Sequence, residues 1–219
     1  MGFSLETIVL WVVPVVFAIT LHEAAHGYVA KLFGDRTADL LGRISLNPLK
    51  HIDPVGTLLV PGVLLMLAWI NKSPPFVFGW AKPVPVNFGN LRDPKRDMIW
   101  VAAAGPGSNF LQGLLWALLM LAVAPNGVWP SAGLFEMADI GFKVNLILMA
   151  LNLLPLPPLD GGRVLAGLLP QRAADALARV EPFGLFIPLG LAATGALGFV
   201  LGPPFVAAMR GTYALFGFQ

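Results

Sequence analysis

The sequence predicts an all-α polytopic membrane protein with about five to six transmembrane or re-entrant helices and a short β-like, membrane-associated loop near residues 75–90. Hydrophobic residues make up 57% of the 219 residues and charged residues 12%, whereas about a quarter of a soluble domain is charged. Several apolar segments approach the roughly 20 residues that cross a bilayer core. The β-like loop is expected where prolines forbid a regular helix between two of these segments.

The apolar segments define the expected helices, which end near polar, glycine or proline residues. They are residues 5–33, 55–70, 98–124 and 134–154, followed by 183–201 and 204–216, which form either one long broken crossing or two short ones. Pro14 is expected to kink the first helix and Gly34 to end it. Residues 163–180 combine charged and apolar positions and predict an amphipathic helix, partly at the membrane interface. With no sign of an appended soluble domain, residues 1–219 are predicted to form a single membrane domain.

The first apolar segment contains the most informative motif, His-Glu-Ala-Ala-His at residues 22–26. On a helix, His22 and His26 lie on the same face and can bind one metal ion. Glu23 lies beside them, where it can take a proton from a metal-bound water. The chain has only three histidines, and polar groups at membrane depth are costly unless something binds them. The motif therefore predicts a catalytic zinc site rather than a chance grouping in a core helix.

A third zinc ligand must lie elsewhere in the chain, because catalytic zinc usually has three protein ligands. The chain has no cysteine, so the candidates are His51 and a carboxylate. Asp160 is the best of these, since it follows a proline-rich break at the end of an apolar segment and precedes Gly161 and Gly162, which allow close backbone approach. An ordinary Asp-Gly turn at a helix end is the alternative.

Topology constrains this pairing of the histidines with Asp160. If residues 55–70, 98–124 and 134–154 each crossed the membrane once and nothing else did, Asp160 would emerge on the face opposite His26. The pairing requires residues 55–90 to turn back toward the starting side. We therefore expect residues 73–90 to fold back into the membrane domain rather than to lie in external solvent.

Charge placement predicts the orientation and the compartment. Four basic residues lie close to the end of the first apolar segment: Lys31, Arg36, Arg43 and Lys50. By the positive-inside rule they favour the cytoplasmic side, which puts the metal site near the cytoplasmic face of a multi-pass protein of the cell (plasma or inner) membrane. The lipid bilayer is thus an expected partner. Nucleic acid is not, because no basic stripe with interleaved aromatic residues occurs.

Two signatures together resemble those of the site-2 protease family of intramembrane zinc metalloproteases. They are His-Glu-Ala-Ala-His at 22–26 and Asn-Leu-Leu-Pro-Leu-Pro-Pro-Leu-Asp-Gly at 152–161. Residues 46–57, 79–87 and 104–109 are also similar to compact bacterial and archaeal members. The chain length leaves no room for the PDZ or CBS domain of larger members.

This resemblance implies one zinc ion per chain, bound by His22, His26 and Asp160, with Glu23 as general base. It also implies a catalytic core near residues 5–165, C-terminal helices near 166–219, and a loop at 75–90 that presents the substrate as an extended strand. The predicted activity is hydrolysis of peptide bonds in or near transmembrane segments of membrane-protein substrates, as in regulated intramembrane proteolysis.

Three further residues are candidates for contacts with the substrate or the oxyanion. Asn109 matches the family's Ala-Gly-Pro-x-x-Asn helix, and Asn152 matches the asparagine that opens the third-ligand motif; each could instead satisfy the backbone of a neighbouring helix. His51 could assist from the cytoplasmic loop, although a cap or turn role is the simpler interpretation. Two other functions stay open: a catalytically silent protein that binds membrane helices, and a metal transporter.

Overall fold

The computed structural model describes residues 5–72, 79–184, 187, 190–191 and 194–216. This part of the chain is all-α, as predicted, and contains no β-strand. The helices, in chain order, are α1 (Leu5–Leu32), α2 (Thr37–Leu40), α3 (Val60–Asn71), α4 (Pro94–Val123), α5 (Ala132–Asn152), α6 (Asp160–Leu168), α7 (Gln171–Ala178) and α9 (Ala196–Phe216). Short 3-10 or π helices are η1 (Pro48–His51), η2 (Pro54–Leu59), η3 (Phe88–Asn90) and η4 (Glu181–Phe183).

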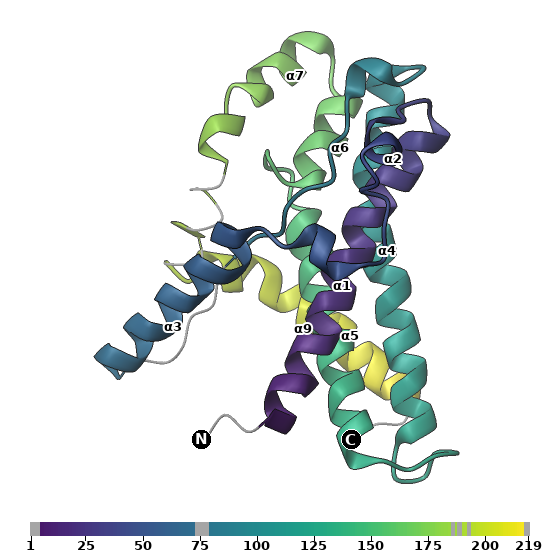
Figure 1. Ribbon diagram of the computed structural model, residues 1–219, viewed down its shortest axis with the longest axis vertical. Coiled ribbons are helices and arrows are strands. Elements are labelled where there is room, and N and C mark those ends of the chain that lie inside the picture. The colour runs from purple at the N-terminus through teal and green to yellow at the C-terminus, as the bar shows by residue number, and fades with distance from the viewer. Residues whose placement is uncertain (1–4, 73–78, 185–186, 188–189, 192–193, 217–219) are drawn as a thin grey trace.

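Helices α1, α4 and α5 lie side by side and form the centre of the molecule, with α6 packed on α4 (Figure 1). The buried face of α1 is rich in small residues, including Ala18, Ala24, Gly27 and Ala30. Small residues let helix backbones approach closely, which increases van der Waals packing between membrane helices. Pro14 lies inside α1, and Gly34 follows its end with a φ of +113°, in the conformation expected of a helix stop.

Three segments of the described chain are long and apolar enough to cross a membrane: α1, η2 with α3 (Pro54–Asn71), and α4. Helix α5 is not among them and carries Glu136, Asp139 and Lys143. Lys143 donates to Asp139 over 2.6 Å, and the hydroxyl of Tyr213 on α9 donates to the same carboxylate. This cluster joins α5 to α9. Helix α3 projects from the bundle (Figure 1) and has no buried residue.

The segment after α3 returns along α1, as the topology argument requires. Backbone N–H groups of Trp80 and Lys82 donate to the carbonyls of Gly56 and His51. Farther along, the N–H of Arg92 donates to the carbonyl of Phe33 at the end of α1. Residues 79–90 thus fold back onto the domain as predicted, with a mostly extended backbone that forms no strand ladder. The first part of the predicted loop, residues 73–78, lies outside the described residues.

Two expectations for the C-terminal part of the chain were wrong: that residues 163–180 form one helix, and that the chain breaks between residues 201 and 204. The single amphipathic helix at 163–180 is divided into α6 and α7, because Pro170 lacks an N–H and disfavours a helical conformation of the residue before it. No helix boundary occurs at Pro203 and Pro204, which lie inside α9. Membrane helices tolerate internal proline where other groups satisfy the freed carbonyls. Residues 185–186, 188–189 and 192–193 of the predicted segment 183–201 lie outside the described residues.

Candidate metal centre

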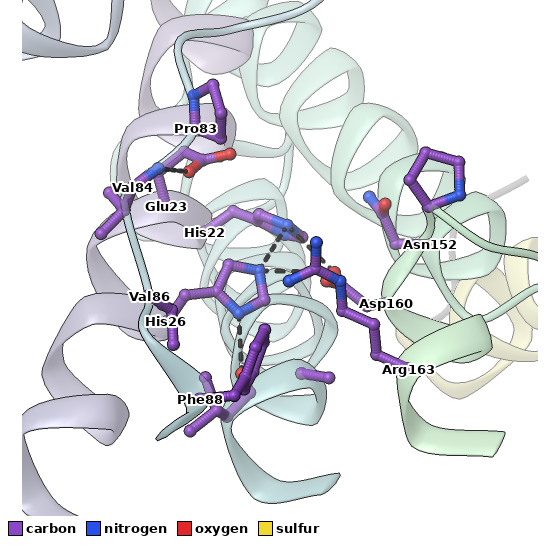
Figure 2. Close-up of a pocket in the computed structure, with 13 residues that line it drawn as sticks. His22, Glu23, His26, Pro83, Val84, Val86, Phe88, Asn152, Asp160 and Arg163 are labelled. Atoms are coloured by element: carbon purple, nitrogen blue, oxygen red, sulfur yellow. Dashed lines mark hydrogen bonds and ion pairs between the residues drawn. The ribbon is translucent and has the colours of Figure 1, made fainter. Parts of the chain in front are cut away.

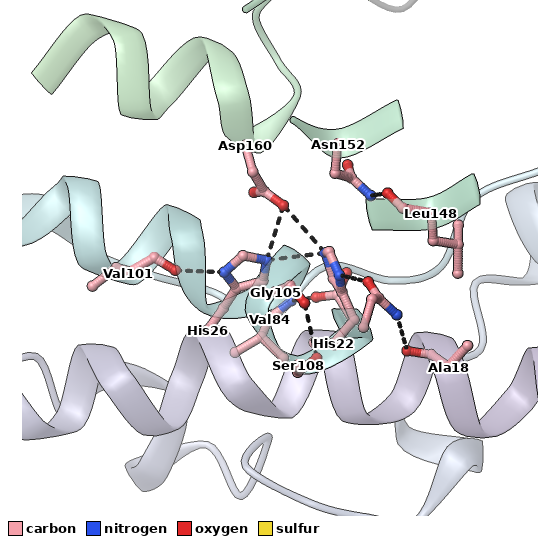
Figure 3. Close-up of polar contacts among 12 residues, drawn as sticks. Ala18, His22, His26, Val84, Val101, Gly105, Ser108, Leu148, Asn152 and Asp160 are labelled. Carbon is pink, nitrogen blue, oxygen red and sulfur yellow. Dashed lines mark hydrogen bonds and ion pairs between the residues drawn. The ribbon is translucent and has the colours of Figure 1, made fainter. Parts of the chain in front are cut away.

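His22, His26 and Asp160 meet at one point between α1 and the start of α6 (Figure 3). The two Nε2 atoms of the histidines are 3.1 Å apart. The Asp160 Oδ2 atom lies 3.3 Å from Nε2 of His22 and 3.4 Å from Nε2 of His26. The structure therefore brings together all three residues for which the sequence predicted a ligand role, across 134 to 138 positions of chain.

Hydrogen bonds at the far side of each ring fix the histidine tautomers. Nδ1 of His22 lies 2.6 Å from Oδ1 of Asn109, and Nδ1 of His26 lies 2.7 Å from the carbonyl oxygen of Val101. Both partners are acceptors, so each Nδ1 carries the proton and donates. The Asn109 amide is oriented in turn, since its Nδ2 donates to Ala18 and Asn145. Both Nε2 lone pairs consequently face Asp160.

This arrangement fits a metal ion. Two nitrogen lone pairs and a carboxylate oxygen face one another with no proton between them, and Asp160 Oδ2 is buried without a hydrogen-bond donor among the described residues. Such a group is stabilised by a cation. Zinc bonds of about 2.0–2.1 Å in a tetrahedral arrangement separate ligand atoms by about 3.3 Å, which matches the observed 3.1–3.4 Å. Three protein ligands is also the number typical of catalytic zinc.

Gly105 of α4 gives the imidazole rings their space. A Cβ atom at this position would lie 2.4 Å from Nε2 of His26 and 2.6 Å from Nε2 of His22. No side chain can occupy that volume while the ligands keep their positions. The small residue is therefore required by the site, and it lies in the 104–109 motif that the sequence resemblance singled out.

Asp160 is positioned by the close approach of α6 to the end of α5. A Cβ atom at Gly161 would lie 2.3 Å from the carbonyl oxygen of Leu153, and one at Gly162 would lie 2.4 Å from the nitrogen of Pro157. Neither glycine has a positive φ. The two glycines are thus explained by backbone proximity, one of the two reasons that the sequence suggested, and not by unusual dihedral angles.

A pocket of about 180 Å³ opens beside the ligand cluster (Figure 2). Its walls come from α1, α4, the returning loop and the α5–α6 junction, and comprise His22, Glu23, His26, Pro83, Val84, Val86, Phe88, Val101, Ala102, Asn152, Pro158, Asp160 and Arg163. Glu23 accepts a 2.6 Å hydrogen bond at Oε2 from the N–H of Val84. The predicted base and the returning loop therefore share one wall of the pocket.

The other three candidate residues occupy different environments. Asn152 lines the pocket, and its amide nitrogen donates to the carbonyl of Leu148 in its own helix. Asn109 is fully buried and contacts His22 rather than the pocket. His51 is buried at the end of η1, with Nε2 2.9 Å from the carbonyl of Ser45, and is not among the residues that line the pocket.

Sequence reasoning missed Asn145 and Arg163. Asn145 accepts from Asn109 and donates to the carbonyl of Gly141, which extends the support of His22 to a third helix. It lies seven residues before Asn152, two helical turns along the same face, and this spacing could have indicated it. Arg163 lies one turn after Asp160, a spacing that carries the same kind of signal.

The fold and the site are those of a membrane protein with a candidate metal centre: two histidines on one helix, a distant aspartate and a neighbouring carboxylate. Comparison with known proteins agrees. The family model described as peptidase family M50 matches residues 121–193. YwhC of Bacillus subtilis, named as a candidate zinc metalloprotease, is 36% identical over 209 residues, which cover 94% of this chain and 90% of that protein.

A second relative with the same kind of name, Rip2 of Mycolicibacterium smegmatis, is 31% identical over 183 residues, 82% of this chain and 65% of Rip2. MJ0611 of Methanocaldococcus jannaschii is 38% identical over 65 residues, 30% of this chain and 31% of that protein. No solved structure matches the chain significantly. The chain belongs to peptidase family M50, the site-2 protease family of zinc metalloproteases, and is a membrane protein.

Proposed function

We propose that the protein is an intramembrane zinc endopeptidase that hydrolyses peptide bonds in or near transmembrane segments of membrane-protein substrates. The observation that carries this proposal is a complete set of hydrolytic groups around one pocket: three converging ligand atoms and the Glu23 carboxylate. The histidines belong to α1, which is long and apolar enough to cross a membrane. A hydrolytic site on such a helix lies within or close to the bilayer, so transmembrane segments are the substrates that can reach it.

The chain's residues divide the work of hydrolysis. His22, His26 and Asp160 would hold zinc, which would act as a Lewis acid and lower the pKa of a water toward about 7. Glu23 takes the proton of the attacking water and delivers it to the leaving amine. The N–H of Val84 holds one carboxylate oxygen of Glu23 and so fixes the orientation of the base.

The returning loop supports the substrate part of the proposal. A transmembrane helix hides its carbonyls in internal hydrogen bonds, so the substrate must unwind locally before attack. Pro83, Val84 and Val86 of the loop line the pocket with extended backbone. The N–H of Val84 is engaged by Glu23 and prolines have no N–H, so the groups of the loop left to pair include the Val84 carbonyl and the backbone of Val86. An unwound substrate segment placed along them would regain part of its backbone hydrogen bonding, as in strand addition to a sheet edge.

The same proposal includes the compartment and the partners. Lys31, Arg36 and Arg43 lie near the end of α1 that follows the histidines, which favours a site near the cytoplasmic face of a multi-pass protein of the cell membrane. The expected partners are the bilayer and a transmembrane protein substrate, with one zinc ion in each chain.

The test is cleavage of tagged single-span substrates by the purified protein in liposomes. Glu23→Gln is expected to retain zinc and to lose cleavage by about 10²–10⁴-fold, because only the base is removed. Asp160→Asn should lose both zinc and cleavage. Glu6→Gln, the same change in the first turn of α1, and Asp175→Asn on α7 are matched controls outside the pocket.

Two outcomes would overturn the proposal. Cleavage by Glu23→Gln at the wild-type rate would remove Glu23 from the mechanism. Zinc-loaded wild-type protein that binds membrane helices and cleaves none would identify a catalytically silent binding protein instead.

A further inference from the structure

Arg163 brings a positive charge to the pocket, and the proposed hydrolytic mechanism does not use this charge. It lies on α6 one turn after Asp160, and Figure 2 shows its side chain reaching toward the ligand cluster. Among the described residues that line the pocket it is the only lysine or arginine. The remaining charged groups there are the carboxylates of Glu23 and Asp160.

Packing orients the Arg163 side chain and leaves its donors available. Its guanidinium carbon lies 5.1 Å from the centroid of the Phe88 ring, within the range of a cation–π contact. No hydrogen bond to another described residue engages it. Its ion partner is Glu181, at 3.7 Å between nitrogen and oxygen, which is too long for a hydrogen bond.

The pairing with Glu181 indicates the chemistry that Arg163 prefers. Glu181 follows α7, and its side chain is 51% exposed, so water competes with the pair and the pair contributes little stability. A ligand carboxylate that enters the pocket can therefore replace Glu181 at small cost. In a closer geometry, the planar fork of an arginine binds a carboxylate through two parallel hydrogen bonds.

The two asparagines do not compete for this role. The amide nitrogen of Asn152 donates to Leu148, and that of Asn109 donates to Ala18 and Asn145. Arg163 is thus the side chain at the pocket, within the described part of the protein, with unengaged strong donors. A negatively charged group of the substrate is the partner that such a cation selects.

We propose that Arg163 forms an anion-binding subsite that binds a carboxylate of the substrate beside the scissile bond. This inference rests on the proposed function for its substrate. The carboxylate has two sources with the same chemistry: an acidic side chain near the cleaved bond, or the α-carboxylate of a substrate whose chain ends there.

The test measures binding separately from cleavage. Fluorescent single-span peptides are titrated into zinc-loaded Glu23→Gln protein, which holds substrate without cutting it. One series of peptide pairs carries Glu or Gln at successive positions along the peptide, and a further pair ends in a free or an amidated C-terminus. We expect at least one charged peptide to bind more tightly than its neutral counterpart, by about tenfold or more. The neutral peptide lacks the charge-assisted bidentate contact with the arginine.

Variants connect that preference to the residue. Adding Arg163→Gln should reduce the charged-to-neutral ratio to about one, whereas Arg163→Lys should retain part of it, since a lysine keeps the charge and loses the fork. Arg172→Gln, on exposed α7, is the matched control and should keep the full ratio. Zinc content and thermal stability of each variant show that it is folded.

The outcomes separate the two proposals. Two results would overturn the anion-binding subsite: equal binding of charged and neutral peptides by folded protein, or a preference that survives Arg163→Gln. Neither result affects the protease proposal. A preference that depends on Arg163 supports the subsite. If wild-type protein then cleaves none of these peptides, the protease proposal fails, and Arg163 is left as a carboxylate contact for a bound membrane segment that is not a substrate.

Discussion

Helices α1 and α3 are similar in composition and opposite in how they pack. Both meet the length and hydropathy expected of a membrane span, with mean hydropathies of 2.0 for α1 and 1.7 for the segment that contains α3. In the most apolar stretch of α1, 33% is buried inside the protein, whereas only 6% of the corresponding stretch of the α3 segment is buried. Helix α1 lies in the bundle, whereas α3 projects from it (Figure 1).

The difference lies in the size and polarity of their side chains. The buried face of α1 combines alanine and glycine with Thr20 and His22, so α4 can approach closely and polar groups can pair across the contact. Helix α3 presents large apolar residues such as Met66 and Trp69, both of which are exposed. Hydropathy thus predicts that a segment enters the membrane, and small and polar residues decide whether it packs against other helices.

The strongest test of the α1–α4 contact is Gly105→Ala. The added Cβ would overlap both ligand imidazoles, so we expect loss of stoichiometric zinc and a fall in cleavage of about 100-fold or more, the scale of a 1 Å misplacement in an active site. Gly107→Ala, whose Cβ meets nothing within 4 Å, is the control on the same helix. Full zinc occupancy in Gly105→Ala, measured by metal analysis, would contradict the ligand geometry.

Asn109→Ala tests the polar side of the same contact. It removes the acceptor that keeps the proton on Nδ1 of His22, and loss of such a partner typically weakens zinc binding about 10–100-fold. Competition with a zinc chelator measures the affinity. Ser108→Ala loses only a hydrogen bond to the carbonyl of Gly105 in its own helix and should bind zinc as wild type does. Equal affinities in the two variants would contradict the orienting role.

Asp35 attaches the returning loop to the end of α1, and its contribution depends on pH. Burial raises the pKa of Asp35, but hydrogen bonds from Thr37, Asn87 and Asn90 outweigh it and hold the pKa below its ordinary value of 3.8. A lowered folded-state pKa gives stability that is fully present above the unfolded pKa and is lost as pH falls through the folded pKa.

Asp35→Asn should therefore cost about 1–3 kcal/mol at neutral pH, and the cost should shrink below about pH 4. Thermal unfolding measured from pH 7 down to pH 2 gives both results, with Asp175→Asn as an exposed control. A cost that stays constant over this range would show that the ionised form of Asp35 is not what stabilises the loop.

The smallest effects are expected from a matched pair of glycine substitutions, one on α1 and one on α3, which compares the two helices directly. In Gly27→Ala the new Cβ would lie 2.9 Å from a methyl of Val84, 3.0 Å from Ile44 and 3.2 Å from the Cβ of Ala38. The first two side chains can change rotamer and Ala38 can move only with its backbone, so we expect a loss of about 1 kcal/mol. In Gly62→Ala on α3 the Cβ meets nothing within 4 Å, and the change should leave stability equal or raise it by up to about 1 kcal/mol. Reversed signs in unfolding experiments would contradict the packing difference.

Local patterns in the sequence were sufficient for much of the fold. The run of apolar residues before Phe33 and the glycine after it predicted α1 within one residue of its observed end, because length and helix stops are local properties. Boundaries at prolines did not follow from local pattern. Pro170 ends α6 and Pro203 does not end α9, since the outcome depends on which neighbouring groups satisfy the freed carbonyls.

The metal site shows the same division. The spacing of His22 and His26 determined that they share a helical face, and the proline-rich break before Asp160 marked it as the candidate partner. The sequence did not reveal that Asn145 supports His22 through Asn109, nor that Arg163 enters the pocket. Helical spacing could have marked both residues, but their partners lie on other helices or in the returning loop, and no short-range pattern identifies those partners.

The sequence by itself determined the membrane environment, the family and the residues able to bind zinc, because hydropathy, helical periodicity and donor chemistry are properties of short segments. Only the tertiary structure decided that Asp160 reaches both histidines, that Val84 holds Glu23, and that α3 stays apart from the bundle. These outcomes depend on how closely backbones approach, as at Gly105, and approach is set by the packing of segments far apart in the chain.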